Sequence, residues 1–141
     1  METNEDSLER FLRAQLWDYE TALKEISAGR KMSHWMWYMF PQMRGLGRSR
    51  NATYYGIKDL EEAKDYLSHP VLGERLREIT TAFLQLSGVS AREVFGHIDA
   101  VKMHSCMTLY NVVSPNDIFQ QVIDKYYDGI VDRLTLSLLK I

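Results

Sequence analysis

The sequence has one cysteine, three prolines and no long apolar run among its 141 residues, and these shortages exclude several classes of protein. A lone cysteine, Cys106, allows neither an internal disulfide nor a metal site built from several cysteines. The longest apolar run, Trp35–Phe40, is far too short to span a bilayer. The acidic N-terminus is unlike a signal peptide. We therefore expect a cytoplasmic protein that does not insert into a membrane.

Familiar reaction signatures are also missing. The chain has no Walker phosphate loop, no dinucleotide-binding fingerprint, no His-Glu-x-x-His zinc helix and no Gly-x-Ser-x-Gly elbow. Its four histidines, at positions 34, 69, 97 and 104, lack the spacing of metal ligands. We expect neither a metal site nor a cofactor, and the sequence does not identify a reaction.

Acidic residues are absent from residues 26–58, where basic side chains gather. This segment carries six of them: Arg30, Lys31, Arg44, Arg48, Arg50 and Lys58. The net charge of the whole chain is −2, so the rest of the chain is acidic. A local positive field would attract anions, although the same side chains would also pair with the acidic remainder across the fold. The overall acidity argues against an extended nucleic-acid-binding face.

Apolar residues recur at helical spacing over most of the chain. The clearest pattern runs from Leu8 to Ile26 and predicts a long helix that starts after Asp6 or Ser7 and ends before Gly29. Residues 1–6 are then expected to be a disordered tail, and residues 7–141 a single domain.

Capping residues and prolines divide the remaining sequence into shorter helices. Residues 43–58 have no helical period and predict a loop with an extended piece at 53–57. The pattern predicts an all-α, compact domain of about six or seven helices. Beyond the first helix, the expected elements are six helices and one short turn of helix. The helices are a short one capped by Ser33 and ending at Phe40, one after Asp59, one from Pro70 toward Gly88, one capped by Asp99, one begun by Ser114-Pro115, and a last one at about 132–139, and the turn follows Ser90 and ends at Gly96.

An aromatic block, Ser33–Gln42, stands immediately before an arginine-rich loop and is the best candidate for a functional site. Trp35 and Trp37 are two positions apart and cannot share one face of a helix. We expect at least one of them in the core, with the other free to line a cleft that stacks a planar ligand. His34, at the start of the block, is placed to exchange a proton near neutral pH. The alternative is a histidine that is only hydrogen-bonded at the helix terminus.

The loop that follows predicts an anion site. Glycines, here Gly45 and Gly47, permit the positive φ that turns successive backbone N–H groups toward one point. Arg48 would add a forked donor, with Ser49 beside it. The alternative interpretation is that the two glycines only make a turn.

A later helix supplies two further candidates. Lys102 and Ser105 are three residues apart and therefore neighbours on a helix surface. Such a pair can act as base and nucleophile, but we favour Lys102 as a ligand contact over covalent catalysis. Cys106 lies in the apolar stripe of the same helix and is expected to be buried and unreactive.

Several of these segments together resemble a known family. The matching residues are Gly29-Arg30-Lys31-x-Ser33-His34-Trp35-Met36-Trp37, Phe40-Pro41-Gln42, Gly45-Leu46-Gly47-x-Ser49, the stretch from Ala63 to Leu76, and Lys102-x-x-Ser105-x-Met107-Thr108-Leu109. They are similar to a family of short bacterial proteins of unknown function that are sometimes labelled calpastatin-like. The resemblance implies a compact multihelical fold and no settled activity. It also implies recurring polar positions at His34, Gln42, Arg48, Ser49, His69, Arg75, Lys102 and Ser105.

Two functional hypotheses follow. The first is a pocket for a small anionic or nucleotide-like molecule, lined by His34, Trp35 or Trp37, Gln42, Gly47, Arg48, Ser49, Lys102 and Ser105. If the protein is an enzyme, hydrolysis or transfer at a glycosidic or phosphoryl bond fits these groups best, with His34, Lys102 and Ser105 as catalytic candidates. The second is a non-enzymatic interaction module that uses the Trp-rich segment as the seam of a homodimer or of a complex with a partner protein.

Overall fold

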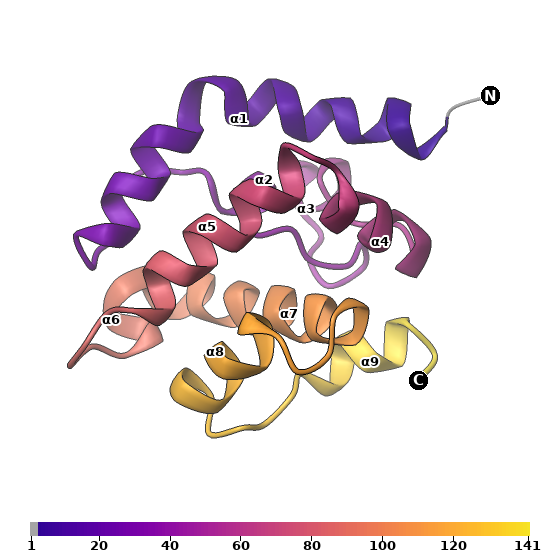
Figure 1. Ribbon diagram of the computed structural model, residues 1–141. Helices are drawn as coiled ribbons and strands as arrows, with labels where there is room; N and C mark the ends of the chain where they lie inside the picture. Colours follow the sequence, from indigo (N-terminus) through magenta and orange to yellow (C-terminus); the bar gives the residue numbers. More distant parts are fainter. Residues whose placement is uncertain (1–2) are drawn as a thin grey trace.

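The computed structural model describes residues 3–141, and this part of the chain is helical throughout apart from its connections (Figure 1). It contains nine helices, five of them seven residues or longer, where the sequence predicted six or seven. The additional elements are short. The helices are α1 (Asn4–Ser27), α2 (Met36–Met39), α3 (Arg50–Tyr54), α4 (Leu60–Ser68), α5 (Leu72–Leu84), α6 (Ala91–Phe95), α7 (His97–Val113), α8 (Ile118–Tyr126) and α9 (Arg133–Leu138).

Helix α1 begins earlier than expected. The Thr3 hydroxyl accepts a hydrogen bond from the backbone N–H of Asp6, and the Asp6 carboxylate accepts one from the backbone N–H of Thr3. This capping box makes Thr3 the N-cap. Residues 3–6 of the expected tail therefore form the cap and first turn of α1, whereas residues 1–2 lie outside the described residues. The helix ends where predicted, and Gly29 follows with a φ of +85°.

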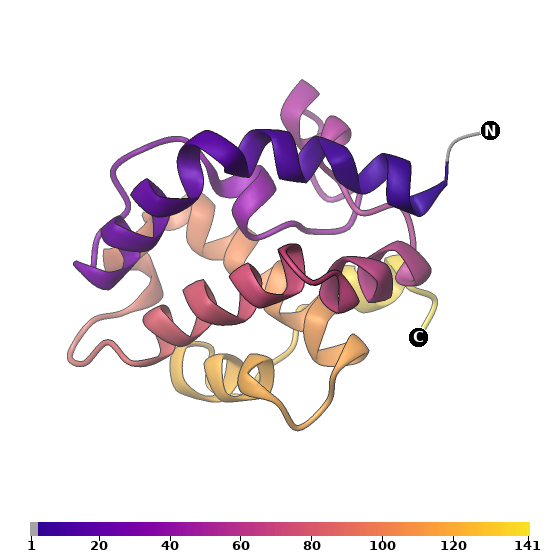
Figure 2. The same cartoon turned by 45° about the horizontal axis from the view of Figure 1, so that its top comes forward.

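The helices form three layers (Figures 1 and 2). Helix α1 packs on α2, α4 and α5, which make the middle layer, and α7 packs on α4 from the opposite side. Helices α6, α8 and α9 surround α7. Consistent with this central place, α7 buries Met103, Cys106, Met107, Leu109 and Tyr110. No described helix in residues 3–141 is long and apolar enough to cross a membrane.

Besides the cap of α1, three further predicted caps are wrong. The Ser33 hydroxyl donates to Glu25 instead of capping, and α2 starts only at Met36. Helix α7 starts at His97, directly after Gly96 with its φ of +80°, so that Asp99 lies inside the first turn. Asp117 caps α8, and the Ser114 hydroxyl donates to the Asp117 carboxylate. At Ser33 and Ser114 a carboxylate accepts the hydrogen bond of the serine hydroxyl. At Gly96 the positive φ places the start of α7 before Asp99.

The 43–58 segment is more ordered than the expected loop. Its ends are joined side by side, because the backbone N–H of Arg44 donates to the carbonyl of Ile57 at 2.8 Å and that of Ile57 donates to the carbonyl of Gln42 at 2.9 Å. Helix α3 occupies the middle, in place of the start of the extended piece expected at 53–57. Gly56 is required here, since a Cβ would lie 2.7 Å from the Arg44 backbone. This closed loop forms one wall of the site described next.

Candidate functional site

A cavity of about 310 Å³ opens between the 42–47 loop, the first half of α7 and the start of α9. Its apolar walls are Leu46, Ile98, Val101 and Leu134, and its polar lining consists of Gln42, Gly47, His97, Lys102, Ser105 and Asp132. A much smaller hollow of about 10 Å³ adjoins it and includes Trp37, with Gln42 and Lys102 lining both. Three segments that are distant in sequence therefore meet at one concave surface.

Gln42 stands at the junction of the two hollows. The 42–57 closure fixes its backbone, and the residue is only 8% exposed. Its side chain lines both hollows, and it is not one of the residues whose buried polar atoms are left unsatisfied within residues 3–141. A buried amide that borders a cavity is available to donate to, or accept from, a bound molecule.

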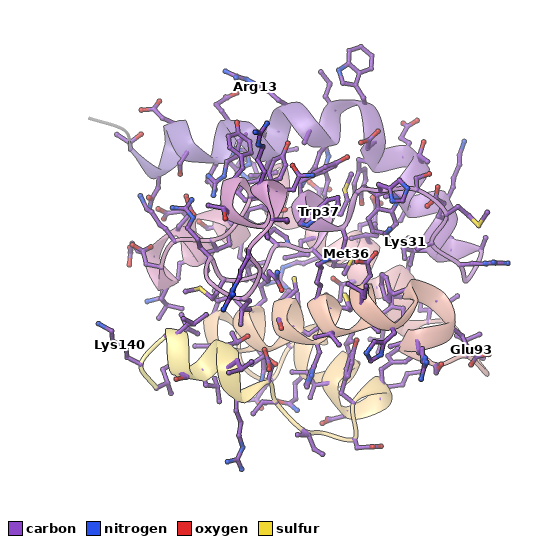
Figure 3. The ribbon with its side chains drawn as sticks, turned by 180° about the vertical axis from the view of Figure 1, so that it is seen from behind. Arg13, Lys31, Met36, Trp37, Glu93 and Lys140 are labelled. Carbon is purple, nitrogen blue, oxygen red and sulfur yellow. The ribbon has the colours of Figure 1, made fainter. Side chains whose placement is uncertain are left out.

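Lys102 is held by a carboxylate and an aromatic face. Its Nζ lies 3.2 Å from one oxygen of Asp99, whose other oxygen is 2.9 Å from the Nζ of Lys31. The Lys102 ammonium also lies 5.1 Å from the centre of the Trp37 ring, within cation–π range. Figure 3 shows Lys31, Met36 and Trp37 between α1 and α7. Two lysines share one aspartate, so this group carries a net positive charge beside the cavity.

Trp35 has a structural place. Its side chain is 1% exposed, and its indole N–H donates to Glu25 at 2.9 Å. Glu25 also accepts from the backbone N–H groups of Met32 and Ser33 and from the Ser33 hydroxyl. Burial raises the pKa of this carboxyl, but these hydrogen bonds outweigh it and bring the pKa down to about 2. Glu25 therefore fastens the segment before α2 to α1 and positions Trp37.

Ser105 and Asp132 meet on the α9 side of the cavity. The Ser105 hydroxyl donates to one carboxylate oxygen of Asp132 at 2.7 Å, and the Thr135 hydroxyl donates to the same oxygen at 2.6 Å. Lys102 pairs with Asp99 instead. The expected Lys102–Ser105 neighbours are thus on one face of α7 but each is bonded to a different carboxylate, which is not the arrangement of a base and its nucleophile.

The remaining predicted site residues lie elsewhere. Arg48 is exposed and lines neither hollow, and His34 is exposed on the segment before α2. The Ser49 hydroxyl accepts from the backbone N–H of Ala52 and caps α3. Gly47 does line the cavity, but its φ is not positive. A glycine is needed here because a Cβ at this position would lie 2.7 Å from the Cβ of Ala52. The loop therefore does not form the predicted nest of N–H groups around Arg48.

Sequence reasoning missed two polar residues of the cavity. His97 and Asp132 lie at the starts of α7 and α9. The sequence predicts Asp132 only as the beginning of the last helix. No local motif marks either one, because the cavity forms between elements distant in sequence. No sequence pattern identifies the four apolar wall residues as part of a site either. Three of them, Ile98, Val101 and Leu134, are more than half exposed, which became informative only in three dimensions.

Metal binding finds no support in the described geometry. In residues 3–141 no group of three histidine, cysteine, aspartate or glutamate side chains is arranged to hold an ion. Cys106 is fully buried and unpaired, and burial raises the pKa of its thiol well above the usual value. A neutral, enclosed thiol of this kind is a packing group.

Comparisons with known proteins give a family without an assigned activity. The model of a family described as "Protein of unknown function (DUF1810)" matches residues 5–139. Among solved structures, the conserved hypothetical protein Rv1873 from Mycobacterium tuberculosis is 47% identical, with a TM-score of 0.93 over 95% of this chain and 96% of that one. No curated protein matches the chain. The calpastatin-like label is not confirmed by these matches.

Proposed function

The chain belongs to the DUF1810 family of proteins of unknown function, and from the geometry of its cavity we propose that it binds a small anionic molecule. Lys102 is the anchor of the proposal. Because Lys31 and Lys102 share the single carboxylate of Asp99, one positive charge remains uncompensated within this group. That charge lies at the cavity wall, with the Lys102 side chain 20% exposed.

Two further features support an anion at this place. His97 and Ile98 belong to the first turn of α7 and line the cavity, so the positive end of a 17-residue helix borders the same space. The side-chain amide of Gln42, which lines the same two hollows as Lys102, offers a donor. The volume of about 310 Å³ is at the lower end for ligand sites. It favours a small metabolite over a dinucleotide.

Trp37 has a different role in this proposal from the one first expected. Its ring lines the small hollow and supports the Lys102 ammonium, so we assign it to holding the cation and not to stacking a planar ligand. The rival homodimer seam has little surface left to use. Trp35, Met36, Met39 and Phe40 are already buried within the chain, leaving only Trp37 and Tyr38 half-exposed in the apolar run Trp35–Phe40.

The proposal is tested by thermal shift with inorganic phosphate, small carboxylates, sugar phosphates and nucleotides. At tenfold excess over the Kd a bound anion adds about 1.4 kcal/mol to stability, a rise of about 3–6 °C for a domain of this size. Lys102→Met should abolish the rise. Lys64→Met removes an exposed lysine on α4 and should keep it.

The melting temperature of Lys102→Met without ligand shows whether the variant is folded as stably as the wild type. Asp99 keeps Lys31 as a partner in Lys102→Met, so no carboxylate is left unpaired and the melting temperature without ligand should change little. If no anion stabilises the wild type, or if the variant responds equally, the proposal is wrong. A mass that rises with protein concentration, without any ligand effect, would favour the interaction module.

A further inference from the structure

Asp132 gives the cavity a second charged end. It begins α9 as the N-cap, yet its side chain makes no cap hydrogen bond to the helix backbone. The carboxylate instead lines the cavity. Ser105, which bonds to it, is one turn along α7 from Lys102, or ~5 Å between neighbouring side chains on a helix face. A lysine and an aspartate therefore line one small space, on two neighbouring elements.

Asp132 is held by three buried hydroxyl groups, two on its carboxylate and one on its backbone. The hydroxyls of Ser105 and Thr135 both donate to Oδ2, and the backbone N–H of Asp132 donates to the hydroxyl of Thr108 at 2.9 Å. All three residues are at least 96% buried. Within residues 3–141, Oδ1 has no hydrogen-bond partner. Asp132 lines the cavity and is partly exposed, so the fold fixes one carboxylate oxygen with hydrogen bonds and leaves the other open to solvent or to a ligand.

An acceptor at this place selects among anions. A ligand made only of negative oxygens is attracted at Lys102 and repelled at Asp132. A ligand with an anionic group at one end and a hydroxyl at the other satisfies both, because the hydroxyl donates to Oδ1. The apolar side chains of Val101 and Leu134 suit the carbon atoms between the two ends.

We infer that the ligand is a hydroxylated anion, a polyol or sugar phosphate or a hydroxy acid, whose hydroxyl is recognised by Asp132. This inference rests on the proposed anion site at Lys102 and names the class of molecule that the site takes. It gives Asp132 the role of a specificity-determining residue and assigns Ser105 and Thr135 to positioning its carboxylate.

Matched pairs of compounds test the inference by calorimetry. Glycerol 3-phosphate and n-propyl phosphate share the anionic group and differ in hydroxyls; glycerate and propionate form the same pair with a carboxylate head. The wild type should bind the hydroxylated member of at least one pair about 10-fold more tightly, as expected for a hydrogen bond to a charged acceptor. The pair with the stronger binding identifies the head group.

Asp132→Asn gives the decisive readout. The neutral variant should bind glycerol 3-phosphate more weakly and n-propyl phosphate more tightly than the wild type, because it loses both the strong acceptor and the repulsion. A purely structural role would change both affinities in the same direction. Asp59→Asn, at the N-cap of α4, serves as the control and should bind both compounds like the wild type.

The outcomes separate this inference from the proposed function. If n-propyl phosphate or propionate binds and Lys102→Met removes that binding, the anion site stands whatever Asp132 does. Equal wild-type affinities within each pair, or parallel losses in Asp132→Asn, would then overturn the inference alone. If no compound binds the wild type, both the anion site and the hydroxyl recognition are wrong.

Discussion

Replacement of Glu25 by glutamine should loosen the segment that presents Trp37 to the cavity. The carboxylate accepts four hydrogen bonds from Met32, Ser33 and Trp35, and its pKa lies at about 2 against an ordinary 4.5. A change of that size corresponds to about 3 kcal/mol at 1.36 kcal/mol per tenfold in acidity. Glu25 is partly exposed, so solvent screening reduces the contribution to about 1–2 kcal/mol.

The sign of the pH dependence follows from the lowered pKa. Glu25 is ionised in the folded protein down to about pH 2, whereas in the unfolded chain it is protonated below about pH 4.5. Its contribution is therefore complete above pH 4.5 and is lost as the pH falls toward 2. The stability difference between wild type and Glu25→Gln should be about 1–2 kcal/mol at pH 7 and should shrink over that interval.

Urea unfolding at a series of pH values between 7 and 2.5 measures this difference. Glu20→Gln, an exposed glutamate on the same helix, is the matched control and should stay within about 0.5 kcal/mol of the wild type. A stability gap for Glu25→Gln that is absent at pH 7, or that is unchanged by acidification, would refute the reasoning.

Three further predictions concern the fold. Glu62→Gln should cost about 3–5 kcal/mol in urea unfolding, because it leaves Arg10, whose side chain is 9% exposed, without its buried partner; a loss under 1 kcal/mol would contradict the account. Gly73→Ala should lower the melting temperature by at least about 6 °C, since the new Cβ would lie 1.9 Å from the carbonyl oxygen of Leu67, and an unchanged value would show that α4 and α5 are not so closely joined. Cys106 should react with a thiol reagent only after unfolding, because it is fully buried and its pKa is raised; fast labelling of the native protein would contradict its enclosed position.

The fold class could be predicted because it depends on local periodicity. The apolar spacing of α1, the Asp59 cap of α4 and the Ser90 cap of α6 are all found in the structure. One of the errors arises because a side chain from another helix binds the residue expected to cap. Ser33 turns to Glu25 on α1 and so caps nothing, an outcome that no pattern within residues 33–40 contains.

The candidate site shows the same division. Trp37, Gln42, Gly47, Lys102 and Ser105 line the cavity or the small hollow beside it, and the sequence predicts all five as site residues. The side chains that bind these residues, such as Asp132 for Ser105 and Trp37 for Lys102, could not be predicted, because they come from other elements. The sequence predicts Arg48 as the cation that binds the anion, because it lies next to the glycines of the loop. In the folded chain the loop closes on itself and turns that arginine to solvent, while a lysine 54 residues later takes the place at the cavity.

The central claim is that an anion binds beside Lys102, and amide chemical shifts in a ¹⁵N-labelled sample titrated with glycerol 3-phosphate test it most directly. The account predicts saturable changes at Gly47, Ile98 and Lys102 with one common Kd, and no change at Arg48 and Arg50. Shifts confined to the two arginines, with none at the cavity, would contradict it.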